Sequence, residues 1–262
     1  MMRLPLNFMP PALGVIALLT DFGTADGYVA EMKGVLLSRS PGVNIVDVSH
    51  DIPPQDIEAA RLSLARYWRR FPKGTVHIVV VDPGVGSERA ALAVESGGHF
   101  LVGPDNGVLS PALFAPDAQV VSLPIPQNAS FTFHGRDVFA PAAASIAAGT
   151  PVNELGEYWP SPVRKRTAEA AKRSDGAIVG EVLTIDRFGN ALTNLVTRVG
   201  GSVLVNDQLL PIVRTYADVN IGEMVALVGS SGFIEIAVRN GNASARLQLQ
   251  RGSEVVLFKS ET

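Results

Sequence analysis

The stretch TVHIVVVDPGVGS, residues 75–87, says more about the fold than any other part of the chain. Residues 75–81 are nearly all apolar and mostly β-branched, which is typical of a strand covered on both faces of a sheet. Asp82 follows at the carboxyl end, where open α/β sheets place their ligands. The stretch therefore predicts a layered α/β sheet, with Asp82 as a site residue or as the cap of a plain turn.

The rest of the first half alternates strand and helix patterns, as this architecture requires. We expect an α/β N-terminal domain of residues 1–160, a layered sheet with flanking helices. One helix opens with the acids Asp56 and Glu58 and closes with arginines, as the helix dipole favours. The expected strands are Val15–Leu19, Val43–Val48, Thr75–Val81, Ala90–Val94 and Phe100–Val102, the last two joined by a turn at Gly97-Gly98, and the expected helices begin near Gly27, Asp56 and Ala140.

The pattern changes after Trp159. Residues 161–176 are rich in charge and poor in large apolar groups, so we expect a linker there. Several short strands separated by polar turns follow, which predicts a small all-β, barrel-like domain of residues 177–262. The expected strands are Ile178–Ile185, Ser202–Val205, Glu223–Val228, Phe233–Val238, Arg246–Leu249 and Glu254–Phe258.

Composition excludes several classes of protein. Of 262 residues, 47% are hydrophobic and 18% are charged, which is enough apolar material for a substantial core. The net charge of −3 argues against a nucleic-acid partner. The chain has no cysteine, so any chemistry must use His, carboxylate, hydroxyl or amide groups.

The start of the chain does not have the pattern of a targeting segment. Pro10-Pro11 interrupts the early apolar run, whereas a signal peptide needs an unbroken apolar core. No apolar run approaches the roughly 20 residues of a membrane span. We therefore expect no membrane association and a cytoplasmic protein.

Three further loops carry polar side chains in positions suited to a site. Asp21 follows the first strand, where a carboxylate can cap a helix or accept hydrogen bonds from two vicinal hydroxyls of a ligand. His134 lies beside a glycine among aromatic and basic residues, and a lone histidine of this kind is either catalytic or structural. Phe188 and Asn190 lie in a polar turn, where they could stack on and pair with a purine, or form a plain hairpin tip.

Asp47, His50 and Asp51 form a cluster of three potential metal ligands. The cluster lies at a strand end that runs into Pro53-Pro54, and its other candidate partners are remote in sequence. We therefore favour a turn or capping role for it over metal binding.

Taken together, these loops resemble the S-adenosyl-L-methionine (SAM) hydroxide adenosyltransferases, the adenosine-forming SAM hydrolases related to the fluorinase and chlorinase. The resemblance extends from about Val15 to Phe258. It is carried by the segments TDFGTADGYVAEMKG, VDVSHDIPPQDIEAA, VVVDPGVGSERAALAV, GPDNGVL, FHGRDVFAP and IDRFGNALTNL, in that order.

The resemblance implies an α/β domain, a C-terminal β-barrel and a homotrimer whose active sites each lie between one subunit's first domain and its neighbour's second. It implies hydrolysis of SAM to adenosine and L-methionine by in-line attack of an activated water or hydroxide on the ribose 5′ carbon. SAM is the substrate, and we expect no further cofactor and no metal.

The resemblance also implies roles for individual residues. The hydrolytic triad of the family matches Asp82, Arg89 and His134. The substrate-binding positions match Asp21 at the ribose hydroxyls, Asp26 and Asp186 at the methionine ammonium, Phe188 against adenine, Asn190 at the adenine edge and Ser230 at the methionine end.

The chain departs from the halogenases of this family. Ser231 stands where they have Arg, Gln55 where they have Trp, and Asp82 where they have Tyr, and their loop insertion after the strand beginning at Arg89 is missing. These differences favour water over halide as the nucleophile. The alternatives are a chlorinase-like halogenase and a non-catalytic SAM- or adenosine-binding protein; methyl transfer is disfavoured because no Gly-rich methyltransferase loop is present.

Overall fold

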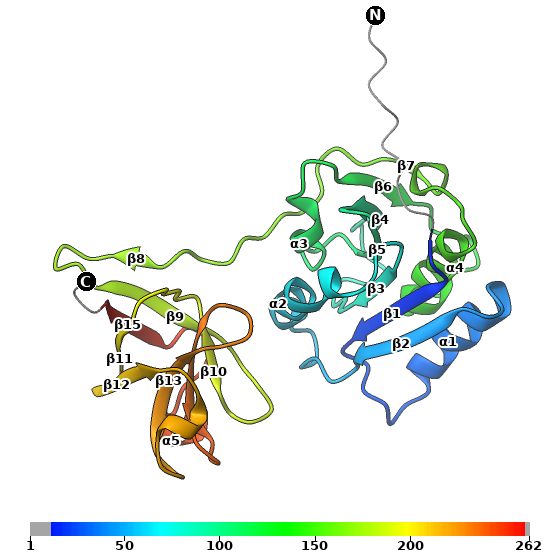
Figure 1. Ribbon diagram of the computed structural model, residues 1–262. Helices are drawn as coiled ribbons and strands as arrows, with labels where there is room; N and C mark the ends of the chain where they lie inside the picture. The colour runs from blue at the N-terminus through cyan, green and yellow to red at the C-terminus, as the bar shows by residue number, and fades with distance from the viewer. Residues whose placement is uncertain (1–11, 260–262) are drawn as a thin grey trace, which may run out of the picture. The chain divides into compact units, whose positions relative to one another are not determined.

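The computed structural model describes residues 12–259, and the chain divides into two units, residues 1–166 and 167–262 (Figure 1). Pro10-Pro11, on which the argument against a signal peptide rests, lies outside the described residues. The division agrees in kind with an α/β domain followed by a β-barrel domain, and this fold class is confirmed.

The first unit is built on a seven-stranded sheet in the order β2-β1-β3-β5-β4-β6-β7. The first four strands in that order are parallel, and the other three are antiparallel to their neighbours. The strands are β1 (Val15–Thr20), β2 (Asn44–Ser49), β3 (Val76–Val80), β4 (Ala91–Ser96), β5 (His99–Pro104), β6 (Gln119–Leu123) and β7 (Glu157–Tyr158). Gly97 and Gly98 both have positive φ, so the predicted β4–β5 turn is confirmed.

Helices cover both faces of this sheet, because successive residues of its central strands point to opposite faces. Ile78 and Val80 of β3 pack in a cluster with α1 and α4, whereas Val79 packs in another with α2 and α3. Figure 1 shows these two helix pairs on opposite sides of the strands. The helices are α1 (Tyr28–Arg39), α2 (Ile57–Tyr67), α3 (Ser110–Leu113) and α4 (Ala140–Ala147), with short 3-10 helices at Trp68–Arg70 and Val152–Glu154 and a π-helical turn at Gly135–Phe139.

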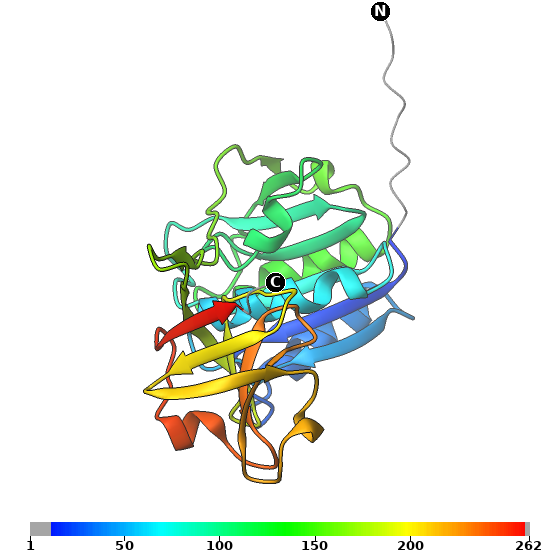
Figure 2. The ribbon, with the colours of Figure 1, turned by 60° about the vertical axis from the view of Figure 1, so that its left-hand side comes forward.

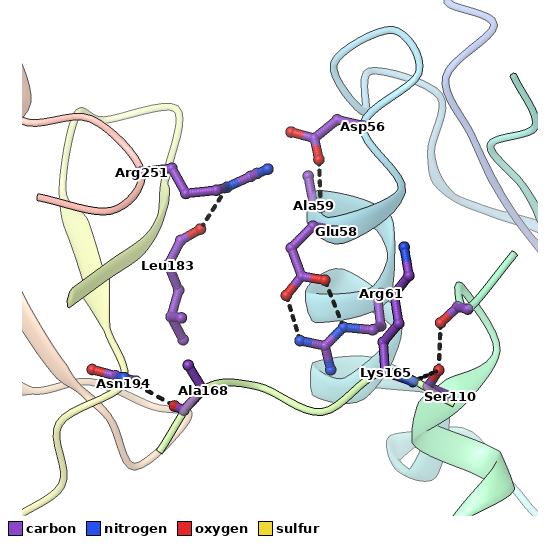
Figure 3. Close-up of polar contacts among 11 residues, drawn as sticks. Asp56, Glu58, Ala59, Arg61, Ser110, Lys165, Ala168, Leu183, Asn194 and Arg251 are labelled. Carbon is purple, nitrogen blue, oxygen red and sulfur yellow. Dashed lines mark hydrogen bonds and ion pairs between the residues drawn. The ribbon is translucent and has the colours of Figure 1, made fainter. Parts of the chain in front are cut away.

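Local side-chain contacts explain where α2 begins. The carboxylate of Asp56 accepts a hydrogen bond from the Ala59 backbone N–H at 2.9 Å, which satisfies one free donor of the first turn (Figure 3). Glu58 pairs with Arg61 one turn later. The predicted acidic start of this helix is therefore a true N-cap.

The second unit is a closed seven-stranded barrel in the order β10-β14-β13-β12-β11-β15-β9, completed by pairing of β9 with β10 (Figures 1 and 2). Its core contains Val182, Val203 and Ile236, which are fully buried. The strands are β8 (Ala171–Lys172), which pairs with the edge of β9, then β9 (Ile178–Ile185), β10 (Ala191–Thr193), β11 (Gly201–Val205), β12 (Gln208–Val213), β13 (Met224–Val228), β14 (Ile234–Val238) and β15 (Glu254–Lys259), with a 3-10 helix at Tyr216–Asp218.

The strand predicted at Arg246–Leu249 is wrong, because Arg246 and Leu247 lie in the short helix α5 (Ala243–Leu247) and the other two residues follow it outside any strand. Asn242 caps the helix by accepting the Ala245 N–H at 2.8 Å, and Gln248 ends it in the left-handed conformation. Leu247 and Leu249 are both buried, and a short apolar alternation of this kind does not distinguish a strand from a helix end.

The predicted linker, residues 161–176, stays a prediction. Within it, the Lys165 backbone N–H donates to Ser110 Oγ at 2.8 Å in the first unit (Figure 3). The later residues Ala171 and Lys172 pair with β9 in the second unit. Among the described helices, none has the length and apolar character needed to cross a membrane.

Candidate functional site

The loops after β1 and β3 leave the sheet at the same edge. The two strands are parallel neighbours, and Thr20 at the end of β1 pairs with Val80 at the end of β3. Asp21 and Asp82 follow these strands, at the edge where open α/β sheets bind ligands. The loop that carries His134 reaches the same region, because Phe133 packs edge-on against Phe22 with ring centroids 5.7 Å apart.

Asp82, Arg89 and His134 converge although they are far apart in sequence. Arg89 Nε donates to Asp82 Oδ1 at 2.9 Å, and Arg89 Nη2 pairs with Asp82 Oδ2. The same Nη2 lies 2.9 Å from His134 Nδ1. The exposed fractions of the Asp82 and Arg89 side chains are 5% and 10%, and His134 is 5% exposed. The structure therefore brings these three predicted residues together around one guanidinium.

The Arg89 contact decides which nitrogen of His134 carries its proton. A guanidinium is a hydrogen-bond donor only, so Nδ1 of His134 must be the acceptor. Burial lowers the pKa of His134, and the nearby charge of Arg89 lowers it further, against weaker opposing effects of Asp82 and Asp137. His134 is thus a neutral imidazole with its hydrogen on Nε2, ready to donate to a ligand.

Close backbone packing holds the loop between Asp82 and Arg89 against the loop that carries His134. Gly86 has φ +78°, and a Cβ at this position would lie 2.5 Å from the carbonyl oxygen of Phe131. Gly84, two residues earlier, has room for a Cβ at ordinary contact distance. Gly86 therefore permits the close approach of the two loops, and Gly84 is not needed for it.

Asp21 is held by the loop before α2. Its Oδ2 accepts the Gln55 backbone N–H at 2.7 Å, and Gln55 has the left-handed φ of 65°. Asp26 lies exposed in the segment that leads into α1. Neither carboxylate has a hydrogen bond to Asp82, Arg89 or His134 among the described contacts, so the structure does not join them to that group directly.

In the second unit, Asp186 organises the turn between β9 and β10. Its Oδ1 accepts the backbone N–H groups of Phe188 and Asn190, each at 2.9 Å. Its Oδ2 accepts the Asn190 side-chain amide at 3.1 Å. The Phe188 side chain is left 74% exposed as a flat apolar face. The structure thus brings these three predicted residues together, with Asp186 as a turn-forming acceptor.

Ser230 lies exposed in the turn between β13 and β14. A cavity of about 670 Å³ lies against the same turn, with Val228 and Gly232 in its lining. The Ser231 hydroxyl, beside Ser230, is buried without a hydrogen-bond partner. In the sequence, Ser231 differs from the Arg that the halogenases have at this position. No residue pattern indicates that its hydroxyl would be unpaired.

Asp47 and His50 contact each other, with His50 Nε2 3.0 Å from Asp47 Oδ1. His50 Nδ1 is hydrogen-bonded to Thr20 Oγ1 at 2.8 Å. Lys33 Nζ lies 2.6 Å from Asp47 Oδ2, so this carboxylate is paired with a cation of the protein itself. Among residues 12–259 no group of three or more His, Asp or Glu side chains is arranged to hold a metal ion.

Both units match known protein families. Residues 16–156 match the SAM hydroxide adenosyltransferase N-terminal domain, and residues 180–256 match the SAM hydroxide adenosyltransferase C-terminal domain. A protein of Thermus thermophilus named (R)-S-adenosyl-L-methionine hydrolase is 43% identical over 92% of this chain and 98% of its own length.

Two further relatives place this match in context. A fluorinase of Actinoplanes sp. is 30% identical over 95% of this chain and 100% of its own length. The crystal structure of an uncharacterized conserved protein from Thermotoga maritima superposes with a TM-score of 0.85, at 32% identity, over 93% of this chain and 100% of that one. The similarity is therefore greater to the hydrolase than to the fluorinase.

Proposed function

This chain belongs to the SAM hydroxide adenosyltransferase family, and from that membership we propose that it is an enzyme that hydrolyses SAM to adenosine and L-methionine. The observation that carries the proposal is the Arg89 guanidinium, which contacts the Asp82 carboxylate on one side and His134 Nδ1 on the other. These three positions match the hydrolytic triad that the sequence resemblance implies.

The bond changes require little from the enzyme at the leaving group. In SAM the sulfur is already positively charged, so the C5′–S bond can break with its electron pair going to sulfur and no acid to assist. The difficult part is the nucleophile, because water is weak and must be aligned opposite the sulfur. Fixing it in line can contribute several kcal/mol through orientation alone.

We assign the nucleophile as hydroxide, or as water that loses its proton to solvent during attack. His134 Nδ1 is occupied by Arg89, so this nitrogen cannot take the proton while the contact lasts. The remaining Nε2–H can donate to the oxygen that attacks, and the guanidinium stabilises its negative charge. Asp82 holds the guanidinium in place through two contacts. The products are adenosine, methionine and one proton, so atoms and charge balance.

The remaining predicted residues would bind the substrate. The Asp21 carboxylate suits the two ribose hydroxyls, the exposed Phe188 ring suits the adenine face, and the Asn190 amide suits the adenine edge. Asp26 and Asp186 are assigned to the methionine ammonium and Ser230 to the methionine end, as the resemblance implies. The three hydrogen bonds that Asp186 accepts within its own turn support a role for it in presenting Phe188 as well.

A homotrimer with inter-subunit active sites and a cytoplasmic location are also part of the proposal. The trimer rests on the family resemblance. Light scattering coupled to size-exclusion chromatography tests the trimer, with a mass of three chains of 27.7 kDa expected.

Halide transfer is the nearest competing reaction, since fluorinases are relatives. The test is product analysis by mass spectrometry after incubation with SAM in the presence and absence of excess chloride. We expect adenosine at the same rate in both. Formation of 5′-chloro-5′-deoxyadenosine would show a halogenase instead, and binding of SAM without any product would show a non-catalytic binding protein.

A further inference from the structure

A series of polar contacts leads from the exposed Asp47 through the buried His50 to the buried Thr20, next to Asp21. Thr20, the last residue of β1, is fully buried, and its Oγ1 is 2.8 Å from His50 Nδ1. His50 is 5% exposed, and its Nε2 is 3.0 Å from Asp47 Oδ1. Lys33 of α1 pairs with the same carboxylate at 2.6 Å. These contacts, called here the Thr20–His50–Asp47 chain, therefore connect a surface cation to the residue that precedes Asp21.

His50 Nε2 lies at an ion-pair distance from Asp47 without hydrogen-bond geometry, and the protons of His50 and Thr20 can be assigned from this contact and from the Thr20–His50 hydrogen bond. The carboxylate of Asp47 stays ionised: burial raises its pKa, but contacts with Lys33 and His50 outweigh burial and lower it overall. An ionised carboxylate favours the proton of His50 on the facing Nε2, which leaves Nδ1 as an acceptor. The Thr20 hydroxyl then donates to Nδ1, and its lone pair accepts the Phe22 backbone N–H at 3.3 Å.

Two further hydrogen bonds hold the backbone around Asp21 and its carboxylate in place. The Gly23 N–H donates to the His50 carbonyl oxygen at 2.8 Å, so His50 holds the residues on both sides of Asp21. Gln55 holds Asp21 Oδ2 at 2.7 Å from its left-handed backbone position. Among the described residues Asp21 Oδ1 has no hydrogen bond, so this oxygen is available to a ligand.

We propose that His50 is a positioning residue: through Thr20 and the Gly23 backbone it sets the Asp21 carboxylate in the orientation that recognises the ribose hydroxyls of the nucleoside. The inference rests on the proposed function for the identity of the ligand, and it adds the Thr20–His50–Asp47 chain to the residues that determine specificity. A plain capping role for these residues would give stability without affecting the choice between ribose and deoxyribose.

The test compares adenosine, 2′-deoxyadenosine and 3′-deoxyadenosine binding by isothermal titration calorimetry on the whole protein. A hydrogen bond to a charged group is strong enough that the wild type should prefer adenosine by about tenfold or more over each deoxynucleoside. Asp21→Ala removes the carboxylate, so it measures the preference for adenosine that remains without this residue. Thr20→Val removes the hydroxyl at nearly constant shape, and Thr20→Ser is its matched control because it keeps the hydroxyl.

We expect the preference to fall to about threefold or less in Thr20→Val and to stay at the wild-type level in Thr20→Ser. With SAM, Thr20→Val should raise KM more than it lowers kcat. His50→Gln keeps a polar group near the Nε2 position but loses the Nδ1 acceptor. It should reduce the preference for adenosine over the deoxynucleosides to the same extent, and it serves as the test if Thr20→Val does not fold.

Uniform weakening of all three nucleosides, with the wild-type preference retained, would overturn the inference and leave only a structural role. So would a wild type that binds the three nucleosides equally. The proposed function is judged separately, by whether the wild type releases adenosine from SAM; a failure there leaves the nucleoside preference measurable and the positioning role still tested.

Discussion

Arg89 Nη2 lies 2.9 Å from His134 Nδ1, and the same guanidinium is paired with the Asp82 carboxylate. This contact means that the imidazole is an acceptor at Nδ1 and a donor at Nε2. It separates two accounts of the reaction, in which His134 either removes a proton from water or donates a hydrogen bond to the attacking oxygen. The structure supports the second.

His134→Ala should abolish adenosine formation while SAM still binds, because the Nε2 donor is lost. His134→Gln places an amide N–H near the former Nε2 position and should recover part of the activity, about tenfold above His134→Ala. Single-turnover kinetics and SAM binding by calorimetry measure the two effects. Equal inactivity of both variants would instead indicate that His134 acts as a base.

Arg89→Lys should lower kcat by about 10²–10³-fold, the range found when one preorganised donor is removed from an anion-stabilising site, because less of the bound water would be present as hydroxide. Lysine keeps the charge but cannot contact both Asp82 oxygens and His134 in the forked geometry of a guanidinium. Steady-state kinetics of adenosine release checks this expectation. A Lys variant with wild-type kcat would show that charge alone is sufficient and that the fork has no role.

The pH dependence of kcat/KM should have an acid limb below the usual histidine range. Burial and Arg89 lower the pKa of His134, so its protonation, which would break the Arg89 contact, occurs only at more acidic pH than for a free histidine. Above this limb the rate should rise with pH as hydroxide becomes more abundant. A further loss of activity on acidification, steeper than the hydroxide dependence and with its midpoint above pH 6.5, would contradict this assignment.

Gly86→Ala should impair the enzyme, because the residue has φ +78° and the new Cβ would lie 2.5 Å from the Phe131 carbonyl oxygen. The loop from Asp82 to Arg89 must then move away from the loop of His134. A displacement on the order of 1 Å can cost about 100-fold in rate. Gly84→Ala is the matched control, since its Cβ meets only ordinary contacts, and it should keep near wild-type kcat. Equal effects of the two substitutions would rule out the close approach as the cause.

Acid should destabilise the first unit through His77, which is fully buried in β3. Burial lowers its pKa to about 3, and the neighbouring His99 adds to the shift. Between the unfolded value near 6.5 and the folded value, the unfolded chain binds one more proton, so stability is lost as the pH falls through this range. The largest slope from one such residue is about 1.4 kcal/mol per pH unit.

His77→Leu should remove this contribution. Urea unfolding followed at pH 8, 6 and 5 measures it, and pH 8 is the internal reference because His77 is neutral there in both states. The variant should lose less stability than the wild type between pH 8 and pH 5. Parallel curves for the two proteins would show that His77 is not responsible for the acid sensitivity.

The sequence predicted β1 to β5 of the sheet, helped by central strands that are buried on both faces and therefore appear as apolar runs, but it did not predict β6 or β7. The residues 75–81 and the short helix-forming segment after Asp56 are examples in which local pattern and tertiary environment agree. The strand prediction at Arg246–Leu249 failed because the segment is too short for its periodicity to distinguish a strand from a helix. The Asn242 cap, which starts α5, favours the helix.

The candidate site was predictable only in part. Asp82 could be placed at a strand end from local pattern, and the family resemblance supplied Arg89 and His134 as its partners. The orientation of His134 and the Thr20–His50–Asp47 chain could not be predicted, because each depends on distances between residues at least 30 positions apart or on which nitrogen faces which group. The unpaired Ser231 hydroxyl likewise depends on burial, which no short pattern encodes.

The most direct test of the central claim is hydrolysis of SAM in ¹⁸O-enriched water, with the products separated and weighed by mass spectrometry. Attack of a solvent-derived oxygen on the ribose 5′ carbon predicts adenosine that carries one ¹⁸O atom and methionine that carries none. Unlabelled adenosine, or label in the methionine product, would contradict the account.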